Sequence, residues 1–372
     1  MIKNTTSDTR TIGEHNLIFE MNDIIDATQA GLSLKGFAYA GAEKSTLLRS
    51  IEKYHSKKYG LYICYNKSLE REARKLFKGH KVDIATGHSL ALNSFNTATI
   101  QLYLNKIKTK LTNDVVLEHS RANLNDEEFS LLDLNKNFRV IKDTVERYIS
   151  SASIDITEIH LSDSSYDLVN KLIKSRKIKA SKKSELYQYI VNQAKKLCRA
   201  MMDPNCNCPY THDTYMKSWQ LSNPKFEYDY IMFDEAQDAN PVLLSVILKQ
   251  KSQQIFVGDK FQSIYQFRGG VNAMDIIPHE ALPLSCSFRY GPELAELATK
   301  VLKHMDDSVC ITGVGYNTEV IRGSKYNGTD KLLYLSHTNI NLLEVLCTCF
   351  QAGVPAVFTT NCSGQLKLAT AL

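Results

Sequence analysis

Short apolar runs separated by longer amphipathic stretches recur along much of this chain. The runs "GLYICY" (60–65), "KVDIAT" (81–86), "YDYIMFD" (228–234) and "QQIFVG" (253–258) are rich in β-branched and aromatic residues, and a fifth run covers residues 36–40. Such runs are typical of parallel strands buried on both faces. Each is followed by a helical stretch or a polar loop, and this alternation predicts a doubly wound α/β domain.

Residues 94–194 follow a different pattern. Apolar positions recur there with helical spacing, most clearly in "SELYQYIVNQAKKLCRAMM", and strand-like runs are scarce. We therefore predict a helical insertion at 94–194, which divides the first α/β domain into residues 1–93 and 195–281.

A second set of elements follows. The strand-like runs "LPLS" (282–285), "KLLYLS" (331–336) and "VPAVFTT" (354–360) alternate with the helical stretches "GPELAELATKVLKHM" (291–305) and "NINLLEVLCTCFQAG" (339–353). This order predicts part of another α/β domain over residues 282–372.

The composition is that of a globular protein. Of the 372 residues, 43% are hydrophobic and 23% charged. No apolar run approaches the roughly 20 residues of a membrane-spanning helix, and the polar start "MIKNTTSDTRTIGEHN" is unlike a signal peptide. Nine cysteines without regular spacing fit a reducing cytoplasm. Cys206, Cys208 and His212 lack the two-pair spacing of a zinc site, so inert thiols are the favoured interpretation.

Charge is unevenly distributed, although the net charge is only +5. The stretch "KLIKSRKIKASKK" (171–183) carries basic residues and no acidic ones, which would suit a phosphate backbone. Taken alone, a solvated helix face explains this stretch at least as well.

The stretch "FAYAGAEKST" (37–46) resembles a phosphate-binding loop between a strand and a helix. Gly41, Lys44, Ser45 and Thr46 are candidate nucleotide-binding residues. Glu43 stands where such a loop favours glycine, because glycine allows both the backbone dihedrals and the close approach of an anion. We therefore expect an impaired but present nucleotide site.

Acidic residues follow the strand in "YIMFDEAQD". Asp234 and Glu235 would emerge at the carboxyl edge of a parallel sheet. One carboxylate of such a pair can hold Mg²⁺ and the other can orient or deprotonate an attacking water. A helix cap is the alternative for an isolated pair, but the lysine-bearing loop upstream favours nucleotide hydrolysis.

The stretch "VGDKFQSIYQFRGGVNAM" contains Asp259, Gln262, Tyr265, Phe267 and Arg268 after a predicted strand. The Gln262 amide can donate to a phosphate oxygen, and the rings of Tyr265 and Phe267 can stack on unpaired bases. Alternating aromatic residues also occur in strand cores. The glycine-rich, charged neighbours favour an exposed platform here.

Together these motifs resemble superfamily 1 DNA helicases of the UvrD/Rep type. The resemblance rests on "AYAGAEKS", "CYNKSLEREA", "TGHSLAL", "FDEAQDANP", "GDKFQSIYQFRGG" and "LPLSCSFRYGPELAELA", in that order, over roughly residues 20–95 and 195–350. The stretch "THDTYMKSWQLSNP" is similar to the branch typified by the F-box DNA helicase and its bacterial and phage relatives. The resemblance implies a RecA-like P-loop NTPase domain and a second, here partial, RecA-like domain, with ATP bound between them.

The resemblance also implies roles for individual residues. Lys44 would contact the β and γ phosphates, Ser45 and Asp234 would hold Mg²⁺, and Glu235 would act on the water. Gln262 would sense the γ phosphate, Phe288 would stack on adenine, and Arg289 would reach the phosphates. The expected cofactors are therefore ATP and Mg²⁺.

The expected partner is single-stranded DNA or a DNA junction, with 3′ to 5′ movement. The positions that match DNA-contacting residues of the family are Asn66, Thr86, His88, Tyr265, Phe267 and Arg268.

Three features depart from the family pattern. Met21 or Asn22 lies near the place of the glutamine that reads adenine, Glu43 replaces a glycine, and the later motifs do not follow. We accordingly expect a C-terminally incomplete helicase that does not unwind duplex DNA by itself. The alternative is a relic that binds single-stranded DNA without hydrolysing ATP. An unrelated P-loop NTPase acting on protein partners is disfavoured, because it gives "GDKFQSIYQFRGG" no role.

Overall fold

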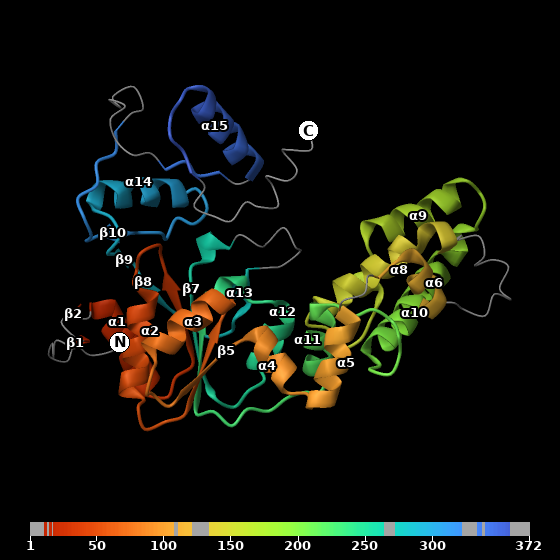
Figure 1. Cartoon of the computed structure of the whole chain (residues 1–372), viewed down its shortest axis with the longest axis horizontal. Helices are drawn as coiled ribbons and strands as arrows, with labels where there is room; N and C mark the ends of the chain where they lie inside the picture. The colour runs from red at the N-terminus through yellow and green to blue at the C-terminus, as the bar shows by residue number, and fades with distance from the viewer. Residues whose placement is uncertain are drawn as a thin grey trace. The chain divides into compact units, whose positions relative to one another are not determined.

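The computed structural model describes residues 11–12, 15–16, 18–107, 111–120, 134–263, 272–321, 333–336 and 339–357. The chain divides into two compact units, Met1–Glu319 and Val320–Leu372 (Figure 1).

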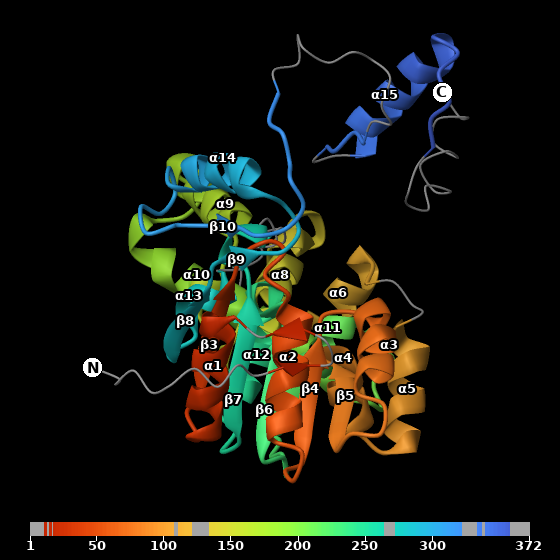
Figure 2. The same ribbon diagram turned by 90° about the vertical axis from the view of Figure 1, so that its left-hand side faces the viewer.

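A parallel sheet of six strands forms the centre of the first unit, in the order β5-β4-β6-β7-β3-β8 (Figure 2). Its strands are β3 (Leu34–Ala38), β4 (Gly60–Cys64), β5 (Val82–Thr86), β6 (Tyr230–Asp234), β7 (Gln253–Gly258) and β8 (Glu280–Leu284). Every neighbouring pair is parallel. The predicted α/β class and the five strands predicted for this domain are confirmed.

Side chains of the inner strands alternate between two cores. In β6, Tyr230 and Met232 join one apolar cluster, whereas Ile231 and Phe233 join the cluster on the opposite face. This follows from the two-residue period of a strand. Both faces are therefore apolar, and both must be covered by helices.

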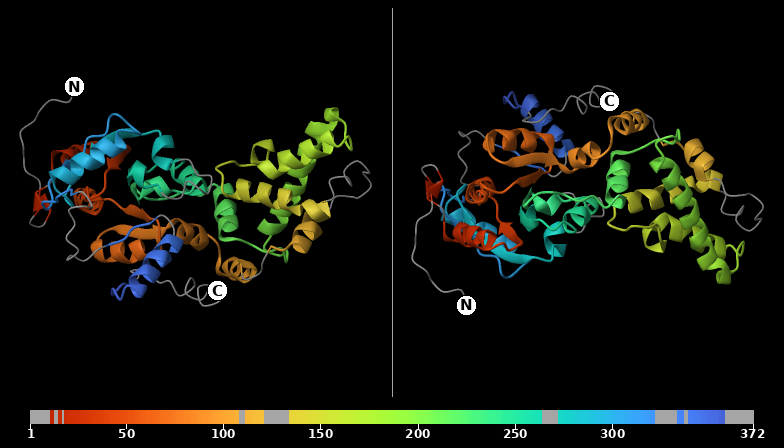
Figure 3. Two further views of the ribbon diagram at one scale, coloured as in Figure 1. Left: turned by 90° about the horizontal axis from the view of Figure 1, so that it is seen from above. Right: turned by 90° about the horizontal axis from the view of Figure 1, so that it is seen from below.

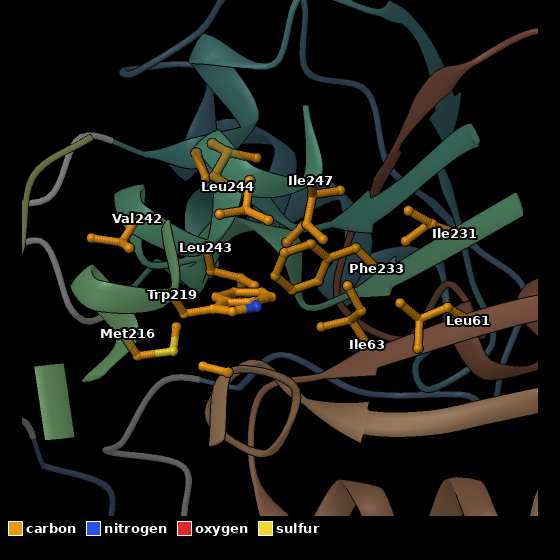
Figure 4. Packing of buried hydrophobic residues seen from close by; sticks show 14 of the residues in the cluster. Leu61, Ile63, Met216, Trp219, Ile231, Phe233, Val242, Leu243, Leu244 and Ile247 are labelled. Carbon is orange, nitrogen blue, oxygen red and sulfur yellow. The ribbon is translucent and has the colours of Figure 1, made fainter. Parts of the chain in front are cut away.

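Helices cover both faces. The first cluster includes residues of α1 (Phe19–Gln29), α2 (Lys44–Tyr54) and α3 (Lys67–Leu76). The second includes residues of α4 (Gly87–Asn93), α5 (Thr97–Ile107), α11 (His212–Leu221), α12 (Pro241–Ile247) and α13 (Ala273–Ile276). Figure 4 shows the second cluster, in which Trp219 of α11 packs among residues of α12 and the strands.

The described part of the predicted insertion consists of helices joined by loops, without a strand. Its main helices are α5, α6 (Asn113–Ser120), α8 (Leu134–Ile149), α9 (Asp163–Lys174) and α10 (Lys183–Met202), with single 3₁₀ turns at Glu158–His160 and Ala180–Lys182. Residues of α6, α8, α9 and α10 form an apolar core of their own, and Figure 3 shows these four helices gathered beside α11. The helical prediction holds, while α10 continues beyond residue 194.

One strand lies in a different sheet from the one expected. The run 282–285, predicted to open the second domain, belongs mainly to β8, which pairs with β3 of the first sheet. A local pattern identifies a strand but not its partner, and Pro283 is tolerated because β8 is an edge strand. The short parallel pair of β9 (Cys286–Ser287) and β10 (Thr312–Gly313) and the helix α14 (Pro292–Leu302) follow within the same unit. The other predicted domain boundaries stay predictions.

The second unit contains the predicted helix at 339–353, observed as α15 (Asn339–Gln351). The strands predicted at 331–336 and 354–360 are wrong for their described residues, since 333–336 and 354–357 have no regular structure. A strand needs a hydrogen-bonded neighbour, and the described part of this unit provides none. A two-residue antiparallel pair, β1 (Thr11–Ile12) and β2 (His15–Asn16), precedes the main sheet in the chain.

Candidate nucleotide-binding site

Residues 39–43, which we call the phosphate loop, lie between β3 and α2 at the carboxyl edge of the sheet. Gly41 has a φ of +83°, and a Cβ there would lie 2.5 Å from Ser287 Oγ and 2.7 Å from Arg289 Cβ. Glycine is therefore needed for both the backbone dihedral and the space. The first turn of α2 begins at Lys44, where backbone N–H groups without helical partners favour an anion.

Glu43 precedes α2 in the left-handed region, with φ 52° and ψ 48°. Its side chain is exposed and makes no capping hydrogen bond. The predicted conflict between this residue and the loop is thus present in the backbone, while the carboxylate faces solvent.

Lys44 forms an ion pair with Glu235 across the sheet edge. Lys44 Nζ donates to Glu235 Oε2, and the two side chains are 16% and 28% exposed. Glu235 directly follows β6 and also adopts the left-handed region, with φ 52° and ψ 44°. This conformation turns the Glu235 side chain away from its strand and toward the phosphate loop.

Asp234 is buried at the end of β6. Its Oδ2 accepts a hydrogen bond from Tyr62 Oη of 2.6 Å, and its Oδ1 accepts from the Glu235 N–H at 2.9 Å. Burial raises the pKa of Asp234, although the bond from Tyr62 and the charge of Lys44 oppose that shift. The sequence did not indicate Tyr62, because it lies inside a strand that reads as apolar.

Asp259 and Gln262 follow β7, the strand that lies between β6 and β3 in the sheet. Asp259 Oδ2 accepts from Gln262 Nε2 at 2.6 Å, and Asp259 Oδ1 accepts from the Phe261 N–H at 3.0 Å. Asp259 is 4% exposed, and burial raises its pKa. Lys44 is among the charges that oppose this shift, so Asp259 belongs to the same electrostatic site.

The segment 286–289 packs directly on the phosphate loop. Ser287 Oγ donates to Ala40 O at 2.8 Å, and the Phe288 N–H donates to Gly41 O at 2.9 Å. Phe288 is half-buried against the first apolar cluster, the one that contains residues of α1, α2 and α3, whereas Arg289 is exposed. The structure therefore brings Phe288 and Arg289 to the loop, as the resemblance implied, and adds Ser287.

The expected glutamine that reads adenine has no counterpart at Met21, which is 1% exposed in the first core. Its neighbour Glu20 accepts hydrogen bonds from the Ser285 N–H at 2.7 Å and from Ser285 Oγ at 2.5 Å. The start of α1 is thus tied to the segment beside the phosphate loop, and Met21 serves packing.

The predicted DNA-contacting residues fall into two groups. Asn66 and Thr86 are the N-caps of α3 and α4, at the carboxyl edge of the sheet. His88 is exposed, and its Nδ1 lies 3.0 Å from Tyr215 Oη of α11. The rings of His212 and Tyr215 pack against the His88 ring, and the resulting loss of hydration lowers the pKa of His88. The second group, Tyr265, Phe267 and Arg268, lies outside the described residues.

The cysteine motif is not arranged as a metal site. Cys206 Sγ lies 3.8 Å from His119 Nδ1, whereas His212 contacts Tyr215 Oη. Within the described ranges, no group of three or more His, Cys, Asp or Glu side chains could hold a metal ion. Inert thiols stay the better interpretation.

Comparison with known proteins decides the family. The UvrD/REP helicase N-terminal domain matches residues 51–275, a span that begins after the phosphate loop and includes Asp234, Glu235 and Gln262. The chain belongs to the UvrD/Rep helicase family.

Two known proteins are similar in sequence to this UvrD/Rep family member over most of its length. F-box DNA helicase 1 of Gallus gallus is 32% identical over 343 residues, which cover 90% of this chain and 32% of the relative. F-box DNA helicase protein 1 of Schizosaccharomyces pombe is 30% identical over 304 residues, covering 76% of this chain and 32% of the relative. The chain therefore spans about a third of the length of these relatives. None of the described helices is long and apolar enough to cross a membrane.

Proposed function

We propose that this chain is an ATP-dependent DNA helicase or translocase of the UvrD type. The ion pair between Lys44 and Glu235 beside the buried Asp234 carries the proposal. It joins a basic group suited to phosphates with a carboxylate suited to a water molecule, at the carboxyl edge of a parallel sheet. The family match and the F-box DNA helicase relatives support DNA as the substrate.

The residues present fit MgATP. Ser45 is exposed in the first turn of α2, and Asp234 lies at the end of β6. Their side-chain oxygens are ligands of the kind that Mg²⁺ prefers. Bound Mg²⁺ would neutralise charge on the phosphates. Gly41, Lys44 and Thr46 would hold the phosphates, and Gln262 and Arg289 would complete the site from the β7 loop and from the segment after β9.

Within this site the protein residues have separable tasks. Lys44 supplies a fixed positive charge, and Glu235 is the base or orienting group for water. Tyr62 holds the Asp234 carboxylate by its hydrogen bond, and the Asp234 carboxylate in turn accepts from the Glu235 backbone. Phe288 offers a half-buried aromatic face for adenine.

For DNA, we propose a single-stranded path over Asn66, Thr86 and His88 that continues to Tyr265, Phe267 and Arg268. Stacking of a base on an aromatic ring contributes roughly 1 to 3 kcal/mol. Phe267→Ala should therefore weaken binding of a fluorescent single-stranded oligonucleotide by about tenfold or more in an anisotropy titration. An unchanged affinity would remove Phe267 from the DNA path.

The resemblance further supports 3′ to 5′ movement. A protein that moves 3′ to 5′ travels farther to the 5′ end of a longer oligonucleotide. The signal of a fluorophore at the 5′ end should therefore appear after a lag that grows with the length of the oligonucleotide. A growing lag for the 3′-end fluorophore instead would reverse the proposed direction.

A specific observation favours a second candidate function, binding of single-stranded DNA without ATP hydrolysis. Glu43 places a strained non-glycine backbone at the phosphate loop. A chain that binds single-stranded DNA but does not hydrolyse ATP at any DNA concentration would support this second function.

A further inference from the structure

We propose that Gln237 is a positioning residue that joins Glu235 to Asp259 and Gln262, so that the carboxylate acting on water and the sensing amide move as one unit. This inference rests on the proposed ATP hydrolysis. The resemblance to the helicase family implied no role for Gln237.

Gln237 spans the gap between the loops that follow β6 and β7. Its Nε2 donates to Glu235 Oε2 at 2.8 Å, and its Oε1 accepts from the Asp259 N–H at 3.0 Å. The side chain is 4% exposed, and both ends of the amide have partners. Gln237 therefore connects two adjacent strand ends through a single rigid group.

The orientation of this amide is fixed by its partners. A backbone N–H can only donate, so the Gln237 oxygen must face Asp259, and the NH₂ group must then face the Glu235 carboxylate. A flipped amide would lose both hydrogen bonds and leave buried polar atoms unpaired. Gly258 allows this close approach, because a Cβ there would lie 2.5 Å from Gln237 Oε1.

The connection extends beyond Gln237 in both directions. Glu235 Oε2 accepts from Lys44 Nζ as well as from Gln237. On the other side, Asp259 accepts from Gln262 Nε2. When Lys44 serves phosphates instead of Glu235, the bond from Gln237 keeps Glu235 Oε2 in place. A displacement of Glu235 would also pull on the segment that carries Gln262.

The test compares Gln237→Leu with Gln237→Glu. Leucine removes both hydrogen bonds, whereas an ionised glutamate keeps the acceptor for the Asp259 N–H, loses the donor to Glu235 and adds a charge that repels the Glu235 carboxylate. Gln254→Leu is the matched control, since Gln254 is another buried glutamine, 5% exposed on β7, that bonds Gln250 O and His279 instead.

In steady-state ATP hydrolysis, both Gln237 variants should lower kcat by roughly tenfold to a hundredfold, the loss expected when a catalytic group is misplaced. The KM for ATP should change less than threefold, because Lys44 and the phosphate loop are intact. Gln254→Leu should keep kcat. In a double-mutant cycle, Gln237→Leu and Gln262→Ala should be strongly non-additive on kcat. Additive effects of Gln237→Leu and Gln262→Ala on kcat, or a change in KM as large as the change in kcat, would show that Gln237 does not couple Glu235 to Gln262.

A second measurement does not depend on hydrolysis. Amide hydrogen exchange in the nucleotide-free protein should become at least tenfold faster over residues 259–262 in Gln237→Leu, and should stay near the wild-type rate in Gln237→Glu and Gln254→Leu. If Gln237→Leu does not fold, Gln237→Glu decides through kcat. A wild type that does not hydrolyse ATP would refute the proposed function, whereas unchanged exchange in Gln237→Leu would refute this inference.

Discussion

At the scale of single residues, the phosphate loop combines one glycine that is required with one glutamate that is strained. Gly41 and Glu43 both have positive φ, but only at Gly41 would a side chain collide with the segment carrying Ser287 and Arg289. The left-handed region costs a non-glycine residue roughly 1 to 2 kcal/mol. The loop carries that strain at Glu43 before any nucleotide binds.

We predict that Glu43→Gly tightens binding of a non-hydrolysable ATP analogue with Mg²⁺ at least tenfold. Glycine allows the loop backbone to adjust to a bound anion, and it removes a negative charge that can turn toward the phosphates. Lys44→Ala in the Glu43→Gly background should abolish the gain. Isothermal titration calorimetry measures both affinities.

The control for Glu43→Gly is Arg176→Gly, which relieves a similar positive φ of 56° within the insertion. It should leave nucleotide affinity unchanged. Equal affinities of wild type and Glu43→Gly would show that Glu43 is tolerated in the loop.

Gly41→Ala provides the opposite test. The added methyl group meets Ser287 Oγ and Arg289 Cβ, so the loop and the segment 286–289 must separate. Gly79→Ala is matched in backbone strain, with φ +85°, but has open space around the added Cβ. Gly79→Ala should lower the free energy of unfolding by about 1 kcal/mol and keep nucleotide binding.

In contrast, Gly41→Ala should lose detectable binding of the ATP analogue in the same calorimetric titration. Retained binding in Gly41→Ala would mean that the contact with Ser287 is not needed for the nucleotide site.

At the scale of elements, α11 connects the insertion to the sheet. Lys217 of α11 is fully buried and donates to Ser151 O at 3.0 Å, to Ser153 O and to Gln220 Oε1 at 2.8 Å. Its Nζ also lies 4.2 Å from the centre of the Tyr148 ring. Gln220 in turn donates to Ala152 O and to Ser245 Oγ of α12. One helix thus holds both the loop after α8 and a helix on the sheet.

Burial lowers the pKa of Lys217 to about 8, so the ammonium is charged at neutral pH and loses its proton at moderately high pH. Between about pH 8 and the ordinary lysine value near 10.4, the unfolded chain holds this proton and the folded chain does not. Stability from this group therefore rises with pH in that window. Relative to Lys217→Met, the wild type should gain roughly 1 to 3 kcal/mol of unfolding free energy across it.

Urea unfolding at several pH values measures this gain, with the single tryptophan, Trp219, as a probe on α11 itself. Ser222→Ala removes a hydrogen bond at the end of the same helix, from Ser222 Oγ to Trp219 O, and does not involve Lys217, so its difference from wild type in unfolding free energy should not change with pH. If the difference in unfolding free energy between wild type and Lys217→Met does not change with pH, burial does not lower the pKa of Lys217 as proposed.

The elements also show what the sequence could predict. The inner strands were recognisable because a strand buried on both faces is apolar along most of its length, as in β4 and in β6 before Asp234. The approach of Lys44 to Glu235 was also predictable, since parallel strands end at one edge. The left-handed backbone of Glu235 and the bridge through Gln237 were not, because both depend on the packing of loops from different strands.

At the scale of the whole molecule, the least predictable feature was the partner of a strand. β8 contains Pro283 and is exposed at several positions, and its register with β3 joins residues far apart in the chain. The runs 333–336 and 354–357 read as strands by their apolar content. Apolar content alone does not provide a neighbouring strand, so these predictions failed.

We propose that the first unit hydrolyses ATP through Lys44 and Glu235 in response to single-stranded DNA. The most direct measurement is steady-state ATP hydrolysis by the purified chain, with and without a single-stranded oligonucleotide, for wild type, Lys44→Ala and Lys57→Ala. Lys57 is an exposed lysine that follows α2 and serves as the matched control. We predict hydrolysis that rises at least tenfold with DNA in wild type and Lys57→Ala and is abolished in Lys44→Ala. Hydrolysis that persists in Lys44→Ala would show that Lys44 is not needed for it, and a wild-type rate that does not change with DNA would show that DNA does not stimulate this site.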